Sequence, residues 1–195
     1  MMKKWVVFLA MSSLLVGANA MAQIDTGENG IGMYFDEGAT INCDNPGAVG
    51  ALDLYLCLTN ITSPDGISGW ECRIEITQGV YILETVLMGY LPINFGSAPD
   101  YIVGLGEPLP WAPSMVVGVF TFGVFMPDPI EIFIKPVVNP SIPGVPAYAD
   151  GANSDILIPL VQSTGGPDIP VGVINGDCPV ANEDATWGSV KSLYR

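Results

Sequence analysis

Short apolar or alternating segments, separated by turn residues, recur along most of the chain. Alternation with a period of two is typical of strands that bury one face, and the spacing of the segments suits a sandwich rather than helices. The 17 prolines and 23 glycines also interrupt the chain too often for long helices. The pattern predicts strands over residues 31–35, 52–59, 70–77, 80–87, 101–105, 115–125, 130–135, 156–161 and 171–174. We therefore expect an all-β jelly-roll or immunoglobulin-like sandwich of about eight to ten strands over residues 23–174. Residues 175–195 are expected to form a C-terminal loop and a short amphipathic helix that docks on the sandwich.

Alternation also assigns faces to the two clearest strands. In residues 52–58 the leucines occupy the even positions, so that Cys57 points the other way. In residues 70–76 the even positions are apolar and include Cys72, and the odd positions form the solvated face: Glu71, Arg73 and Glu75. Cys72 is therefore expected to face the core and Cys57 to face outward.

The N-terminus predicts export. Lys3 and Lys4 precede an apolar run that ends in the small-residue pattern Ala20-Met21-Ala22. This order is typical of a secretory signal peptide, here residues 1–22, with cleavage before Gln23. The apolar run is shorter than the roughly 20 residues that span a bilayer, so no membrane insertion is expected. We expect a secreted, periplasmic or cell-surface protein.

All four cysteines belong to the predicted mature chain, and an oxidising compartment favours two disulfides. Four cysteines allow three pairings, and the sequence does not choose among them. A direct Cys57–Cys72 bridge would join side chains predicted to lie on different faces. We therefore favour Cys43–Cys72 together with Cys57–Cys178, which would fasten the C-terminal segment to the sandwich.

Charge and the absence of histidine exclude several classes of function. The net charge of −14 becomes −16 without Lys3 and Lys4, so nucleic acid and anionic membranes are not expected partners. The chain contains no histidine, which removes Ser-His-Asp and Cys-His catalysis. The segment "GLGEPLP", residues 104–110, contains two prolines that forbid a phosphate-binding helix, and it is predicted to be a turn.

Two aromatic residues are candidates for ligand contact. Trp111 stands between Pro110 and Pro113 and could stack on a sugar or a peptide, although large aromatic residues more often seal the end of a sandwich. Tyr148 lies in the proline-rich stretch 136–155, which has no periodicity and is predicted to be a wrapped loop.

Two long stretches resemble a known family. The stretch "SGWECRIEITQGVYILETVLMG", residues 68–89, resembles the signature of cohesin-type, carbohydrate-binding-module-like modules, with "ILETV" at residues 82–86 matching their extended segment. Residues 100–138, "DYIVGLGEPLPWAPSMVVGVFTFGVFMPDPIEIFIKPV", are similar to the later part of such modules. The resemblance implies a jelly-roll sandwich that binds a partner module noncovalently as part of a secreted or surface-attached scaffold.

The C-terminal stretch has its own possible role. The sequence "NGDCPVANED", residues 175–184, is similar to one calcium loop of a dockerin repeat, which implies Asn175, Asp177 and Asp184 as ligands. Alternatively, Asn182 caps a helix that docks on the sandwich through an apolar stripe of Trp187, Val190, Leu193 and Tyr194. A second acidic loop offers calcium the oxygens of Asp150, Asn153 and Asp155. No cofactor other than calcium at these loops is expected.

These observations predict a noncatalytic exported module for binding, adhesion or scaffolding, with a protein or glycan partner. One alternative is a carboxylate-dependent glycoside hydrolase, for which the candidate acids are Glu71, Glu75, Glu84 and Glu131. Another is a structural subunit of a surface layer.

Overall fold

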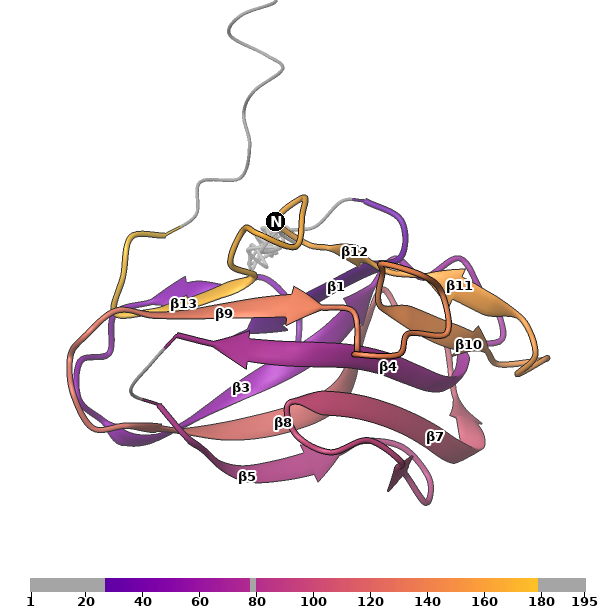
Figure 1. Ribbon diagram of the computed structural model, residues 1–195, viewed down its shortest axis with the longest axis horizontal. Helices are drawn as coiled ribbons and strands as arrows, with labels where there is room; N and C mark the ends of the chain where they lie inside the picture. The colour runs from indigo at the N-terminus through magenta and orange to yellow at the C-terminus, as the bar shows by residue number, and fades with distance from the viewer. Residues whose placement is uncertain (1–26, 78–79, 179–195) are drawn as a thin grey trace, which may run out of the picture.

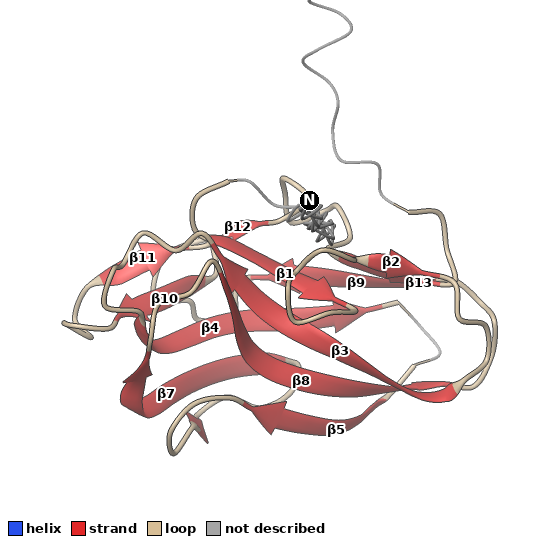
Figure 2. Ribbon diagram, turned by 180° about the vertical axis from the view of Figure 1, so that it is seen from behind, coloured by secondary structure: helices blue, strands red, loops and turns tan. Residues whose placement is uncertain are grey.

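The computed structural model describes residues 27–77 and 80–178, which form two β-sheets packed face to face (Figure 1). Every regular element within these residues is a strand, and they contain no helix (Figure 2). The predicted all-β sandwich is thus confirmed. The expected signal peptide and the expected C-terminal helix lie outside the described residues.

One sheet has five strands in the order β12-β1-β3-β8-β5 and lies in front in Figure 2. Its members are β1 (Gly30–Tyr34), β3 (Gly50–Thr59), β5 (Ile82–Leu87), β8 (Ser114–Val124) and β12 (Val161–Gln162). The long pair β3 and β8 runs antiparallel and forms the centre of this sheet. β5 pairs with β8 and forms one edge.

The other sheet has eight strands and is built around β4 (Ile67–Ile76). One edge of β4 pairs first with β10 and then with β9, and the opposite edge pairs with β7, which also holds the short β6. The remaining members are β2 (Cys43–Asp44), β6 (Ile93–Asn94), β7 (Asp100–Leu109), β9 (Ile130–Lys135), β10 (Ala147–Asp150), β11 (Leu157–Pro159) and β13 (Gly172–Ile174). β4 therefore brings strands from distant parts of the sequence side by side.

The described residues form more strands than expected, thirteen rather than about eight to ten. Six of them have four residues or fewer, and such strands pair through backbone hydrogen bonds without a side-chain period that sequence reasoning could detect. Two further predictions are corrected. Residues 104–109 continue β7 instead of forming a turn, and β10 lies inside the stretch predicted to be a wrapped loop.

The core lies between the two sheets and confirms the predicted faces. From β3 it receives Leu54, Leu56 and Leu58, and from β4 it receives Trp70, Cys72 and Ile74. The Tyr101 ring stacks on Trp70 with ring centroids 6.3 Å apart and meets Phe120 edge-on at 5.2 Å. Burial raises the pKa of the Tyr101 hydroxyl. The strand period alone placed these side chains correctly because both strands bury one face.

Cys57 points away from this core but is still buried. It packs with Tyr34 and Ala39 beneath the loop that follows β1. The Asp36 carboxylate fixes that loop by accepting hydrogen bonds from the backbone N–H groups of Thr40 at 2.9 Å and Ile41 at 2.7 Å. A local loop thus covers a side chain on the outer face of the five-stranded sheet.

The predicted disulfide pairings, Cys43–Cys72 and Cys57–Cys178, are wrong. The bridge joins Cys43 to Cys178, and both Cys57 and Cys72 are free. β2 and β13 are parallel neighbours with Cys43 opposite Val173, which brings the segment after β13 to Cys43. Cys57 and Cys72 belong to different sheets and face different sides, so they cannot meet. The observed bridge agrees with an oxidising extracellular or cell-surface compartment.

The two free thiols are expected to be unreactive in the folded protein. Burial raises the pKa of Cys57 to about 12 and raises that of Cys72 as well, so neither side chain supplies the thiolate that attacks a disulfide reagent. Ellman's reagent should therefore detect no thiol in the native protein and two after unfolding without reductant. Rapid reaction of the native protein would contradict the burial of the two thiols, and no thiol after unfolding would contradict the observed pairing.

Candidate functional site

A row of small residues crosses the outer face of the eight-stranded sheet. Gly69 on β4 stands opposite Gly104 on β7 and opposite Ala149 on β10. The row ends in larger side chains, because Gly104 pairs with Ile93 and Ala149 pairs with Leu157. A Cβ atom at position 69 would lie only 2.6 Å from the carbonyl oxygen of Val103, so the close strand approach here requires glycine. Three neighbouring strands therefore leave a depression in the sheet surface.

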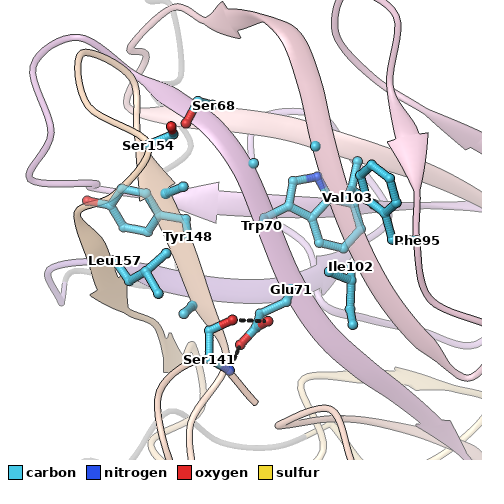
Figure 3. Close-up of a pocket in the computed structure, with 14 residues that line it drawn as sticks. Ser68, Trp70, Glu71, Phe95, Ile102, Val103, Ser141, Tyr148, Ser154 and Leu157 are labelled. Carbon is cyan, nitrogen blue, oxygen red and sulfur yellow. Dashed lines mark hydrogen bonds between the residues drawn. The ribbon is translucent and has the colours of Figure 1, made fainter. Parts of the chain in front are cut away.

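This depression is a pocket of about 250 Å³. Phe95 forms one wall, with its ring 3.3 Å from where a Cβ of Gly104 would lie, and Leu157 stands on the opposite side (Figure 3). Ser68 and Ser154 lie at one end, and Glu71 and Ser141 lie at the other (Figure 3). The pocket thus has an apolar floor and walls with polar groups at its two ends.

Glu71 belongs to the predicted solvated face of β4 but is buried. Its side chain points to the outer side as expected, but the residue is only 5% exposed. The segment 136–146, between β9 and β10, covers it: the backbone N–H of Ser141 donates to Oε1 at 2.7 Å, and the Ser141 hydroxyl donates to Oε2 at 2.8 Å. The prediction that Glu71 is solvated was wrong because this cover comes from residues about 70 positions away.

Glu71 has no cationic partner within residues 27–77 and 80–178. The two basic residues in this part of the chain are Arg73 and Lys135. Arg73 pairs with Glu75 at 3.7 Å and with Asp100 at 3.3 Å, whereas Lys135 pairs with Asp168 at 2.7 Å. The buried carboxylate therefore relies on the two hydrogen bonds from Ser141.

The two aromatic residues predicted to contact a ligand differ in their position relative to the pocket. Tyr148 contributes to the pocket lining but is only 1% exposed, and its hydroxyl donates to Asn29 Oδ1 at 2.9 Å. Trp111 is 49% exposed, lies outside that lining, and donates from Nε1 to the carbonyl of Ile61 at 3.0 Å. A role of either residue in ligand contact stays a prediction.

Two of the three predicted calcium ligands of the 150–155 loop, Asp150 and Asn153, are engaged within the loop. Asp150 Oδ1 accepts from the N–H groups of Ala152 and Asn153, and Asn153 Oδ1 accepts from the N–H of Asp155. The structure therefore explains the Asp150 and Asn153 side chains as turn formers.

Of the C-terminal candidates for calcium binding, Asn175 is also engaged in hydrogen bonds. Asn175 pairs its amide with the backbone of Gly47, accepting at 2.8 Å and donating at 3.1 Å, while Asp177 is exposed and Asp184 lies outside the described residues. Within the described ranges no three acidic or cysteine side chains gather in a way that could hold a metal ion. Calcium binding by this set stays a prediction.

The four glutamates proposed as hydrolase acids do not share a groove. Glu71 is the single carboxylate in the lining of the pocket. Glu75 lies four residues further along β4, about 13 Å away for an extended strand. Glu84 lies on β5 in the other sheet. Glu131 on β9 stands diagonally across from Glu75, but both residues are exposed on the sheet surface. Glycoside hydrolysis needs two carboxyl groups that face each other about 5 to 10 Å apart across a substrate groove, and the pocket lining contains one of these four glutamates.

A second feature is an unusual concentration of exposed apolar side chains. We call it the 81–95 surface; it comprises Tyr81, Leu83, Val86, Met88, Tyr90, Leu91, Ile93 and Phe95. The segment passes from the edge strand β5 to the β6 segment, which pairs with β7 in the other sheet. Sequence reasoning missed it because an alternating strand with one apolar face predicts burial, and here both faces of the segment carry apolar residues.

Contacts between neighbouring residues extend this surface. Phe125, itself exposed, and Leu83 both lie over Gly123, within 2.7 Å and 3.3 Å of where its Cβ would be. Leu91 and Tyr90 both lie over Gly106 on β7. Phe95 belongs both to the 81–95 surface and to the wall of the pocket, so the two features adjoin each other.

The described ranges contain no helix long and apolar enough to cross a membrane.

Comparison with known proteins finds solved chains of similar structure. No protein-family model matches the chain, and no curated protein matches it either. The sixth cohesin of Acetivibrio cellulolyticus scaffoldin B, solved in complex with the Cel5 dockerin, is 15% identical with a TM-score of 0.48 and covers 77% of this chain and 100% of its own. A type II cohesin domain from the cellulosome of the same organism is 14% identical with a TM-score of 0.41 and covers 76% and 96%. The expected resemblance to cohesin domains is thus confirmed as a structural similarity, which at these identities concerns the fold.

Proposed function

We propose that this protein is a noncatalytic, exported binding module that docks a protein partner on the 81–95 surface. The observation that carries the proposal is the exposure of eight large apolar side chains within fifteen residues. Soluble monomers rarely leave such groups together in water, and exposed apolar patches mark sites of association. The sequence resemblance to cohesin-type modules supports the same class of function.

The chemistry of the surface also favours one kind of partner. Its aromatic members, Tyr81, Tyr90 and Phe95, supply large contact areas with few rotatable bonds, as in the centres of protein interfaces. The acidic chain around it would repel an acidic partner and attract a basic one. We therefore propose a partner with a complementary apolar face and a neutral or basic rim.

The variant Leu91→Asp tests this proposal. Leu91 is 65% exposed, so a charge there leaves the fold intact but places a carboxylate inside the proposed interface. Immobilised wild-type protein should retain a partner from the medium of the producing culture, and Leu91→Asp should weaken that retention by about tenfold or more. Protease treatment of the medium should abolish retention if the partner is a protein, and leave it intact if the partner is a glycan.

Val138→Asp provides the matched control, because Val138 is 63% exposed and lies outside the 81–95 surface. Equal retention by both variants and the wild type would refute the docking surface. Turnover of glycans by the wild type would refute the noncatalytic assignment, and calcium-induced self-assembly would favour the surface-layer alternative.

A further inference from the structure

We propose that the pocket beside Phe95 is a receptor for a lysine side chain of the partner protein. This inference rests on the proposed function, since it assigns the lysine to the partner that covers the adjoining 81–95 surface. The pocket combines two properties that a lysine side chain needs. It offers apolar floor and walls for the methylene stem and a buried carboxylate at the far end for the ammonium group (Figure 3).

The floor explains why a flexible aliphatic stem fits there. Gly69, Gly104 and Ala149 stand in one row across three strands and carry no side chain beyond a methyl group. The Phe95 and Leu157 side chains border the row on either side. A four-carbon stem laid along the strands would therefore exclude water from the floor and bury apolar surface on both sides.

The end of the pocket supplies the charge. Glu71 is 5% exposed, and neither Arg73 nor Lys135 pairs with it. A buried carboxylate without a cation is costly, because two hydrogen bonds from neutral donors replace only part of its hydration. A cation entering the pocket would compensate the charge of Glu71, and the net negative charge of the whole chain would attract it.

The geometry at Glu71 favours an ammonium group over a guanidinium group. Ser141 occupies both carboxylate oxygens, donating from its backbone N–H to Oε1 and from its hydroxyl to Oε2. A guanidinium group binds best through two parallel hydrogen bonds to both oxygens, an arrangement that Ser141 already takes. An ammonium group is a point charge with freely rotating donors and needs only one remaining lone pair.

The test uses small probes and the full mature chain, and it does not require the partner. N-acetyl-lysine methylamide, its norleucine counterpart and its arginine counterpart are titrated while the backbone amide NMR signals are followed. We expect the lysine probe to shift the signals of Ser141, Gly104 and Gly69, the norleucine probe to shift them little, and the arginine probe to bind more weakly than lysine. Glu71→Gln should weaken lysine binding by about tenfold or more, because it removes a charge-assisted hydrogen bond.

Glu75→Gln is the matched control, since Glu75 lies on the same face of β4 but outside the pocket lining, and it should leave binding unchanged. If Glu71→Gln does not fold, Ala149→Leu fills the row opposite Gly69 while keeping the Glu71 carboxylate, and it should also abolish binding. Equal binding of lysine and norleucine probes, binding retained in Glu71→Gln, or no shift with any probe would overturn the inference. These outcomes leave the proposed function standing, because Leu91→Asp tests it separately.

Discussion

Replacing both Cys43 and Cys178 with serine should lower the free energy of unfolding by about 4 to 5 kcal/mol, one of the two largest effects expected for this protein. The bridge joins residues 135 positions apart, so its loss frees almost the whole described chain in the unfolded state. The bridge also holds the segment after β13 against β2, where one short parallel pair makes the connection. Urea denaturation of the oxidised proteins, followed by circular dichroism, measures the difference.

Reduction offers the control for this prediction. A reductant should lower the stability of the wild type to the level of the double variant and leave the double variant unchanged. Peptide mapping that found Cys57 bridged to Cys178, or a wild type indifferent to reductant, would contradict it. The two free cysteines make the test specific, since only one bridge is available to break.

Phe120→Ala should cost about 3 to 5 kcal/mol of stability. The Phe120 ring is fully buried between the sheets and meets the edge of Tyr101 at 5.2 Å, so its removal creates a cavity that the long β3–β8 pair cannot close. Thermal and urea unfolding both measure the loss.

Phe125→Ala is the matched control on the same stretch of chain. Phe125 is 65% exposed, and its removal should change the free energy of unfolding by no more than about 0.5 kcal/mol. Equal losses in the two variants would mean that Phe125, and with it the adjoining part of the 81–95 surface, is covered in solution. The pair therefore checks the core and the exposure of the proposed docking surface together.

The two proposed contact features adjoin each other at Phe95. The 81–95 surface is broad and apolar, whereas the pocket is small and ends in a buried carboxylate. Broad apolar contact supplies affinity, and a buried charged end selects the partner, because a wrong side chain would leave Glu71 without compensation. A single partner that covered both would be bound through complementary kinds of interaction.

The sequence predicted the strands and their faces well where a side-chain period exists. Alternation placed Leu54, Leu56 and Leu58 in the core and turned Cys57 outward, and the structure agrees. The period depends only on the local backbone geometry of a strand, so it can be read from one segment alone. Export also follows from the order of residues at the N-terminus, which lies outside the described residues and stays a prediction.

The candidate site could not be predicted in the same way. Gly69, Gly104 and Ala149 come from three separate segments, and each small residue in isolation suggests only a weak strand or a turn. Their meaning comes from the pairing of β7, β4 and β10, which makes them neighbours in one row. A sequence signal does exist for the 81–95 surface, since that segment is apolar on both faces, but only the structure shows that Ile82 and Leu87 pack against the core while Leu83 and Val86 stay exposed.

The sequence by itself therefore determined the class of fold, the faces of the main strands and the acidic, histidine-free chemistry, because these depend on local periodicity and composition. Only the tertiary structure decided which cysteines pair, which strand forms the edge, and that Glu71 is buried under Ser141. Each of these depends on contacts between residues far apart in the chain. The free energy of such contacts is set by the whole arrangement of strands and by no single segment.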